Sequence, residues 1–284
     1  MPRSPESYVT SFSELFKEGI QHSEIQQALS PPPLTSQRPL VAMISPHPDD
    51  ECLVAGVALR LRQEVGAQLV NIPLSYGSNP ETWPRRTHEL TQACAQLGMA
   101  LHDVPPGSFG HIYISERMEH FAEWRKKTQL LSSILAQLRP EYLMFPHAHD
   151  GHPAHVGTHF LVMDALAMLP DYSCQLVLTE WWHANEHPNT LIELSTQHVT
   201  TMLQGLCAHR GEIARNPYHL RLPASLMEQV RRGVEMVGAR DTPVQNFVFG
   251  QLLDVQKYSY GKTLPAAKKI MGLHSSLAAL LDPS

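Results

Sequence analysis

The chain has 284 residues, 43% of them hydrophobic and 17% charged, which is enough for one large α/β domain or two small ones. Its net charge is −5 with histidine neutral, and no basic stripe is present, which argues against nucleic acid as a partner. No apolar run approaches the roughly 20 residues of a membrane span, and no signal-peptide pattern opens the chain. The sequence therefore predicts a cytoplasmic protein without a membrane span.

The N-terminal region is predicted to be a helical extension. Apolar residues recur at helical spacing between 8 and 29, before the breaker "SPPPLTSQRP". We expect residues 1–38 to form this extension and its Pro-rich connector, packed on a single domain over 39–284. The apolar stripe is also the first place to look for a homo-oligomer interface.

Strand and helix patterns alternate through the next part of the chain. The apolar segments 40–45, 68–75, 141–145 and 174–182 are typical of strands, and the segments 51–63, 85–98, 116–138 and 153–168 of helices. Further on, 190–194 is a weaker strand prediction, 195–210 and 224–237 look helical, and the tail from Asp254 is loosely patterned. This order predicts an α/β fold, a Rossmann-like three-layer sandwich with a mostly parallel sheet, in which ligands bind outside the carboxyl ends of the strands.

The first polar cluster, "SPHPDDE", follows the strand predicted at 40–45. Several buried carboxylates repel one another unless a cation or solvent lies among them. His47 and Asp50, three residues apart at a strand-to-helix turn, suit Zn²⁺ or another first-row divalent metal, which leaves Asp49 free to deprotonate a water. Taken alone, the cluster also fits a helix N-cap without any metal.

The second cluster lies in the loop and helical turn after the strand at 141–145 and contains His147, His149, Asp150, His152, His155 and His159. His155 and His159 are spaced i, i+4, so they share one face of a helix. One histidine of the cluster would be the third metal ligand, and another a general acid or oxyanion stabiliser. A surface histidine loop is the alternative, but two such clusters at equivalent strand ends favour a metal site.

The two clusters together resemble the PIG-L/LmbE-like family of zinc-dependent N-deacetylases. The family's HPDDE motif is present as "PHPDDE" at 46–51, and its HxxH motif as "HPAH" at 152–155. Between them, "RRTHELTQACAQLG" is similar to the family's R-x-x-E-L helix and carries Arg86 and Glu89. The resemblance covers about residues 39–160 and implies an LmbE-like fold.

The resemblance implies the role of each motif residue. His47, Asp50 and His155 become the metal ligands, Asp49 the general base, and His152 the group that stabilises the oxyanion or protonates the leaving amine. The cofactor implied is Zn²⁺, although Fe²⁺ or another divalent metal also suits these ligands. The reaction implied is attack of a zinc-activated water on an acetamide carbonyl, which releases acetate and a free amine.

One position departs from the family pattern. The HPDH motif carries an acid that orients its first histidine, and here that position is Ala154. Asp150, two residues before His152, is a candidate to take over this role or to contact substrate. Arg86 is a second substrate-binding candidate, for a hydroxyl or a phosphate.

Two enzymatic functions and one binding function fit this pattern. The first is removal of acetyl from an N-acetylglucosamine-type amino sugar or its conjugate, a small-molecule substrate. The second is a zinc amidase that acts on a non-sugar acylated amine. The third, motivated by Ala154, is a non-catalytic metal-binding or sugar-binding relative, although such a protein has no physical need for an unligated Asp49 beside the metal.

Overall fold

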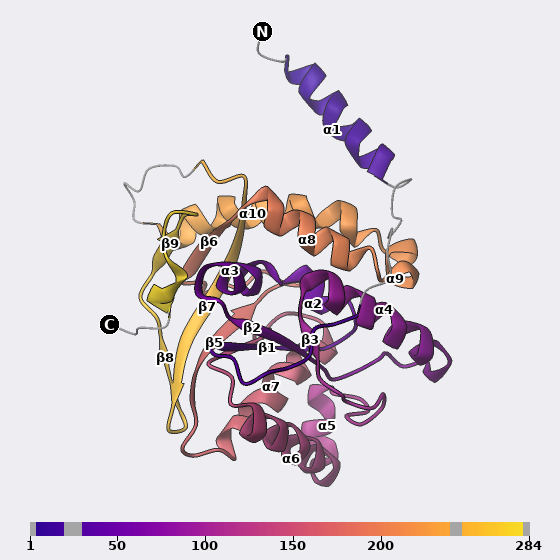
Figure 1. Cartoon of the computed structure of the whole chain (residues 1–284), viewed down its shortest axis with the longest axis vertical. Coiled ribbons are helices and arrows are strands. Elements are labelled where there is room, and N and C mark those ends of the chain that lie inside the picture. Colours follow the sequence, from indigo (N-terminus) through magenta and orange to yellow (C-terminus); the bar gives the residue numbers. More distant parts are fainter. Residues whose placement is uncertain (1–3, 20–29, 239–245, 281–284) are drawn as a thin grey trace.

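The computed structural model describes residues 4–19, 30–238 and 246–280. Within these residues, nine strands form one sheet in the order β3-β2-β1-β4-β5-β7-β6-β9, with β8 paired to β7 (Figure 1). The strands are β1 Leu40–Ser45, β2 Gln68–Pro73, β3 Ala100–Leu101, β4 Tyr142–Pro146, β5 Ser173–Thr179, β6 Thr190–Leu194, β7 Phe249–Ser259, β8 Lys262–Pro265 and β9 Lys269–Met271. Strands β3, β2, β1, β4 and β5 run parallel to one another, whereas β7 is antiparallel to β5. The predicted mostly parallel α/β sheet is confirmed.

Helices cover both faces of the sheet, as the three-layer prediction requires. The helices are α1 Pro5–Gly19, α2 Asp50–Leu53, α3 Gly56–Val65, α4 Trp83–Leu97, α5 Ile114–Glu119, α6 Phe121–Leu138, α7 Pro153–Ala167, α8 Thr196–Leu206, α9 Arg210–Arg215 and α10 Tyr218–Val237, with short 3₁₀ turns at Pro80–Thr82 and Leu277–Leu280. One core joins alternate residues of β1 to α2, α3, α4, α8 and α10. A second core joins the other residues of β1 to α6 and α7, on the opposite face.

Two predicted helices are each divided in the structure. The helix expected over 51–63 is split between α2 and α3, where the Gln251 side chain of β7 accepts the N–H of Val57 and donates to the carbonyl of Val54. This amide replaces helical backbone bonds with tertiary ones, so the chain turns without leaving buried polar groups unpaired. The helix expected over 116–138 is split at His120, whose φ of −126° lies outside the helical region.

The C-terminal part contains the longest strand of the sheet, which the sequence patterns did not predict. β7 pairs antiparallel with both β5 and β6. Strand β7 lies between two other strands and is mostly buried. Its sequence "FGQLLDVQKYS" therefore alternates only partly between apolar and polar residues, and no strand pattern predicts it.

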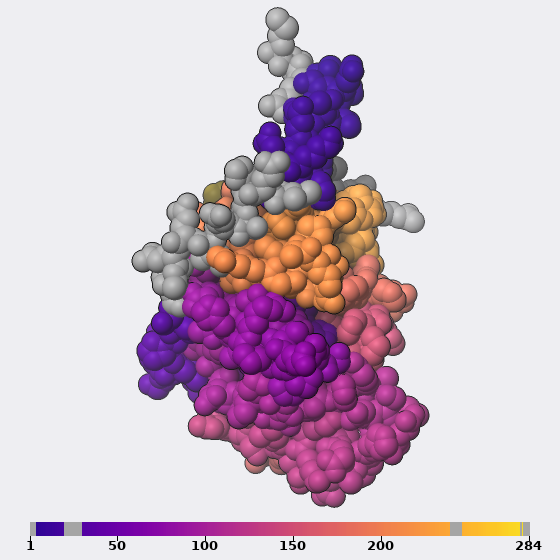
Figure 2. Space-filling view, turned by 90° about the vertical axis from the view of Figure 1, so that its right-hand side faces the viewer, coloured from indigo at the N-terminus to yellow at the C-terminus, as the bar shows by residue number. Residues whose placement is uncertain are grey.

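Helix α1 confirms only part of the helix predicted over 8–29, since residues 20–29 lie outside the described part of the chain. It extends away from the body of the molecule (Figures 1 and 2), and none of its residues is buried. Near its end, the Phe16 ring lies 4.9 Å from the Arg221 guanidinium of α10. Tyr8, Val9 and Phe12 are exposed, but they line a pocket together with Ala224 and Met227 of α10, so the packing of this extension on the domain stays a prediction. The boundary at residue 38 remains a prediction.

Among the described residues, no helix is long and apolar enough to cross a bilayer.

Candidate functional site

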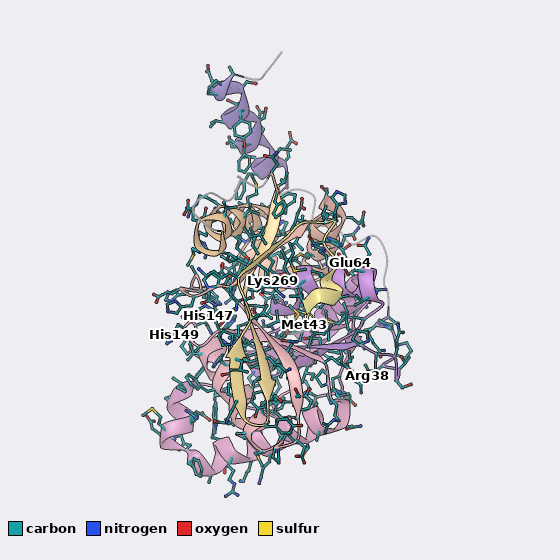
Figure 3. All side chains as sticks on the ribbon, turned by 90° about the vertical axis from the view of Figure 1, so that its left-hand side faces the viewer. Arg38, Met43, Glu64, His147, His149 and Lys269 are labelled. Atoms are coloured by element: carbon teal, nitrogen blue, oxygen red, sulfur yellow. The ribbon has the colours of Figure 1, made fainter. Side chains whose placement is uncertain are left out.

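Both polar clusters lie at the carboxyl ends of neighbouring parallel strands. The first follows β1 and the second follows β4, and these two strands are paired. Figure 3 shows Arg38, which precedes β1, and His147, which follows β4, at opposite ends of these parallel strands. The topology thus brings residues 47–50 and 147–155 to one edge, as ligands of a doubly wound sheet require.

The first loop has a strained backbone at Asp49. Its φ of 125° and ψ of −29° lie in a region that residues other than glycine rarely adopt. The Asp49 N–H donates to Glu51 Oε2 at 2.9 Å, and the Asp49 carbonyl accepts from Cys52 N at 2.9 Å. The His47 N–H donates to Asp50 Oδ2 at 2.8 Å. These bonds fix the backbone that carries the two aspartates.

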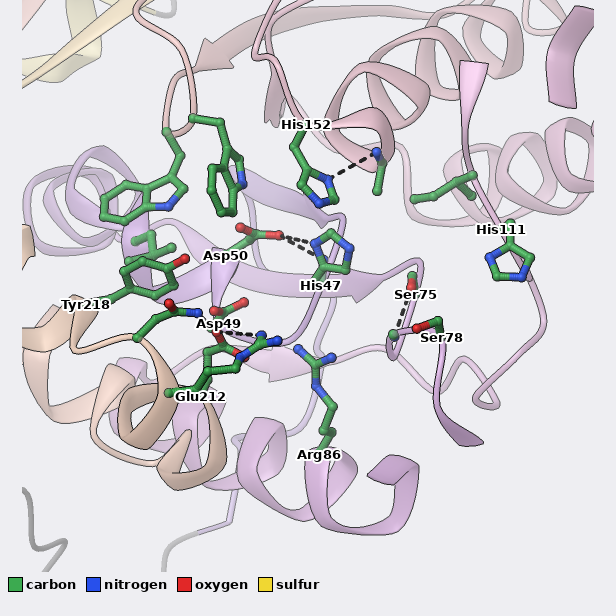
Figure 4. Close-up of a pocket in the computed structure, with 18 of the residues that line it drawn as sticks. His47, Asp49, Asp50, Ser75, Ser78, Arg86, His111, His152, Glu212 and Tyr218 are labelled. Atoms are coloured by element: carbon green, nitrogen blue, oxygen red, sulfur yellow. Dashed lines mark hydrogen bonds and ion pairs between the residues drawn. The ribbon is translucent and has the colours of Figure 1, made fainter. Parts of the chain in front are cut away.

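Four side chains converge above this loop. Asp50 Oδ2 lies 3.4 Å from His47 Nδ1 and 3.3 Å from His155 Nε2. His47, His152 and His155 each offer a ring nitrogen, and these three atoms lie within 4.8 Å of one another. The predicted ligands His47, Asp50 and His155 therefore lie together. Figure 4 shows His152 beside His47 and Asp50.

The buried nitrogen of His155 indicates that this group of side chains fits a cation. His155 Nδ1 lies 2.6 Å from Asp150 Oδ2, so the neutral ring donates there and leaves a lone pair on Nε2. Nε2 is buried and makes no hydrogen bond, although Asp50 Oδ2 faces it. Two electron-rich atoms at this separation repel one another unless a positive charge lies close to both. Nitrogen and carboxylate donors suit Zn²⁺ or Fe²⁺.

The pKa values of Asp50 and His155 also indicate that this group of side chains is stabilised by a positive charge. Burial disfavours the Asp50 carboxylate, but His155 and His47 hold its pKa far below the ordinary value. Burial also disfavours a charged His155, yet Asp50 and Asp150 raise its pKa to about 10. Without a metal, a proton on His155 therefore compensates the carboxylates, and a metal ion would replace that proton.

Asp49 differs from Asp50 in having no such partner. Burial and the neighbouring Asp50 raise its pKa well above the ordinary value. Its carboxyl group lines the cleft beside the ligand set, and no histidine of the described residues is hydrogen-bonded to it. It is therefore placed to exchange a proton with a molecule in the cleft.

His152 caps helix α7 and faces the same cleft. Its Nδ1 accepts the N–H of Ala154 at 3.2 Å, so a neutral ring carries its proton on Nε2. The Trp182 ring stacks on it with centroids 5.3 Å apart. Burial lowers the pKa of His152, and His47 and His155 lower it further. His152 is thus arranged as a neutral hydrogen-bond donor.

The structure corrects the role expected of Asp150. Asp150 is buried, and its Oδ2 bonds to His155 rather than to His152. Its Oδ1 accepts the backbone N–H groups of residues 181, 182 and 183 at 2.8, 3.0 and 3.2 Å. It is absent from the cleft wall, so it is placed to orient a metal ligand and not to contact substrate.

Arg86 lines the cleft as expected, but it also fixes the loops around it. Its guanidinium donates to the carbonyls of Tyr76 and Pro48, each at 3.2 Å. Gly77, with φ of 88°, lies so close that a Cβ there would be 2.5 Å from Arg86 Nη1. Arg86 therefore connects α4 to the "PHPDDE" loop.

The cleft itself has a volume of about 340 Å³ and is lined from both halves of the chain. Beyond the predicted residues, its wall contains polar and aromatic side chains that no motif indicated: Ser75, Ser78, His111, Tyr113, Trp181, Trp182, Glu212, Arg215, Asn216 and Tyr218. Glu212 and Arg215 come from α9, Asn216 follows it, and Tyr218 begins α10; Figure 4 shows Glu212 and Tyr218 at the cleft. Trp181 and Trp182 follow shortly after the end of β5, whereas no motif marks residues 212–218.

Comparisons with known proteins match the first half of the chain to one family. Residues 42–166 match the family model described as PIG-L, GlcNAc-PI de-N-acetylase. A curated relative from Mycobacterium leprae, strain Br4923, is named 1D-myo-inositol 2-acetamido-2-deoxy-alpha-D-glucopyranoside deacetylase. It is 28% identical over an alignment of 159 residues. The alignment covers 46% of this chain and 51% of the relative. The chain thus spans about half the length of this relative.

Solved structures share the fold over a larger part of the chain. The N,N'-diacetylchitobiose deacetylase from Pyrococcus horikoshii superposes with a TM-score of 0.52 at 14% identity, covering 92% of this chain and 95% of that one. GalB, the 4-carboxy-2-hydroxymuconate hydratase from Pseudomonas putida KT2440, gives a TM-score of 0.56 at 16% identity, covering 77% and 96%. Since a deacetylase and a hydratase both share this architecture, the fold alone does not determine the reaction.

Proposed function

We propose that this chain is a metal-dependent N-deacetylase, because residues 42–166 match the PIG-L family model. The proposed substrate is an N-acetylglucosamine-type amino sugar or a conjugate of one. The description of the family and the name of the M. leprae relative support this choice. The observation that carries the proposal is the unligated carboxyl group of Asp49 beside His47, Asp50 and His155. A site that only stores a metal has no use for it.

We assign the metal to His47, Asp50 and His155, with His152 kept for substrate. When bound, Zn²⁺ or a similar ion supplies a Lewis acid that lowers the pKa of water and polarises an amide carbonyl. His152 Nε2 is near enough to be a fourth ligand. However, its neutral N–H is better used as a donor, because three protein ligands leave the open position that a catalytic site needs.

The side chains of this chain then divide the proton transfers between them. Asp49 accepts the proton of the attacking water and can return it to the amine that leaves. The His152 N–H donates to the carbonyl oxygen as negative charge develops there, and Trp182 holds the imidazole ring in place. The polar and aromatic wall formed by Tyr218 and its neighbours would hold the rest of the substrate.

The test is acetate release from N-acetylglucosamine, its glycosides and its inositol conjugate by zinc-loaded protein. Asp49→Asn should lower kcat by at least ~100-fold with unchanged metal content, because general-base catalysis contributes about 10²- to 10⁴-fold. Asp164→Asn is a matched control, since Asp164 pairs with Arg117 and Trp124 away from the cleft. Acyl release from non-sugar amines alone would contradict the sugar assignment and favour a zinc amidase. Zinc and sugar binding without release of any acyl group would favour a non-catalytic relative.

A further inference from the structure

The Asp49 carboxyl group depends on a backbone conformation that needs support. A residue other than glycine with φ of 125° is strained, so surrounding contacts must hold it. Its N–H has one acceptor among the described residues, Glu51 Oε2 at 2.9 Å. The position of the Glu51 carboxylate therefore decides whether Asp49 keeps this orientation.

Glu51 is held in turn by a residue from the other half of the chain. Its side chain is completely buried, and a buried carboxylate requires a partner. His209 Nε2 lies 2.6 Å from Glu51 Oε1, and His209 is only 1% exposed. The Cys52 thiol, 3.2 Å from the same oxygen, is a much weaker donor. His209 is thus the main support of the carboxylate.

The connection is rigid at both of its ends. Helix α8 packs tightly on α2, because a Cβ at Gly205 would lie 3.0 Å from Cys52 Sγ. The His209 carbonyl accepts the N–H groups of Glu212 and Ile213, both at 2.9 Å, and so begins helix α9. Since α9 supplies Glu212 and Arg215 to the cleft wall, His209 joins the wall and the Asp49 loop into one unit.

We propose that His209 is a positioning residue for the deacetylation reaction, which acts through Glu51 to keep the Asp49 carboxyl group directed into the cleft. This inference rests on the proposed function and extends it beyond the PIG-L match, which ends at residue 166. His209 touches neither the metal ligands nor the cleft. Its effect reaches the reaction only through Glu51 and Asp49.

The test compares His209→Leu, which removes the donor, with His209→Gln, whose amide can still donate to Glu51. His209→Leu should lower kcat by about 10- to 100-fold, the range for losing an outer support or misplacing a catalytic group by ~1 Å, with KM and bound metal within twofold. His209→Gln should stay within about threefold of wild type. His198→Leu is the matched control, because His198 of α8 is a buried histidine too and bonds to Gln63 away from the cleft.

The second arm repeats His209→Leu in an Asp49→Asn background. If His209 acts only through Asp49, the second substitution should lower the residual kcat by less than about twofold, because residues that act as a unit are not additive. A full additional loss, or an equal loss in His198→Leu, would show that His209 is merely structural and overturn the proposal.

Crystal structures of the variants supply a readout that does not require turnover. In His209→Leu, Glu51 should move away from the Asp49 N–H, and the φ of Asp49 should leave the positive region. In His209→Gln both should stay in place. If the backbone conformation of Asp49 is unchanged in His209→Leu, the positioning role is refuted, even if no acylated amine is a substrate. If Asp49 is displaced but the wild-type protein releases no acetate, only the deacetylase assignment is refuted.

Discussion

Replacement of Asp150 by asparagine should weaken metal binding, although Asp150 itself is not a ligand. The carboxylate accepts the His155 Nδ1–H through Oδ2 and three backbone N–H groups through Oδ1. An asparagine keeps the shape but has one acceptor oxygen and one NH₂ group. If the oxygen stays on the backbone amides, the NH₂ group faces His155, and the ring must carry its proton on Nε2, where the metal should bind.

The magnitude follows from the partner that is lost. A hydrogen bond to a charged group contributes about 1.5–3 kcal/mol, and outer partners of metal-binding histidines are worth 10- to 100-fold in affinity, or about 1.4–2.7 kcal/mol. The short contact of 2.6 Å and the 1% exposure of the Asp150 side chain place this case toward the upper end. We therefore expect the zinc dissociation constant to rise about 30- to 100-fold.

The assay is competition for zinc with a calibrated chelator, beside thermal unfolding of the metal-free proteins. Asp164→Asn is again the control, since Asp164 also accepts several hydrogen bonds but is distant from the ligand loops. A zinc dissociation constant for Asp150→Asn within twofold of wild type would refute the reasoning. So would a loss of affinity in Asp164→Asn as large as that in Asp150→Asn.

Three further predictions concern the surroundings of the site. Trp182→Ala removes the ring stacked on His152, so kcat should fall about 3- to 10-fold, and equal kcat values for variant and wild type would argue against stacking as support. Gly157→Ala would place a Cβ 1.4 Å from the Ile112 carbonyl oxygen, and denaturant titration should show a loss of about 3 kcal/mol in the free energy of unfolding. Burial lowers the pKa of His159 from 6.5 to about 4, so the unfolded chain binds this proton first and stability falls as the pH drops below 6.5. His159→Gln should remove about 2 kcal/mol of that loss at pH 5, which unfolding curves at pH 5 and 7.5 would detect.

The sequence was most informative where chemistry is concentrated in short segments. "PHPDDE" and "HPAH" each follow an apolar strand, and parallel strands present their carboxyl ends at one edge, so the convergence of residues 47–50 with His155 could be predicted. Helical periodicity likewise predicted the helix over 85–98. It ends before Gly98, whose φ of 61° suits a glycine. Both predictions rest on local rules that tertiary structure did not override.

Contacts between distant segments were not predictable in this way. The division between α2 and α3 depends on Gln251, about 200 positions away in the chain, and periodicity over residues 51–63 contains no trace of it. Likewise, Glu212 and Tyr218 reach the cleft because α9 and α10 lie over the α2 and α4 layer. Their own segment has ordinary helical composition, so only the folded chain shows their place in the wall.

The hydrogen-bond partners of the buried carboxylates Asp150 and Glu51 have one physical origin. Closeness in sequence suggested that Asp150 would serve His152, two residues away, yet the positive φ of 80° at Gly151 turns the chain so that Asp150 faces inward. There it meets His155, five residues on, and the backbone of residues 181–183. His209 reaches Glu51 across 158 positions in the same manner. In both cases a buried carboxylate takes the partner that lies within hydrogen-bond distance in the folded core, so the ligands can be found from a motif, whereas their supports require the structure.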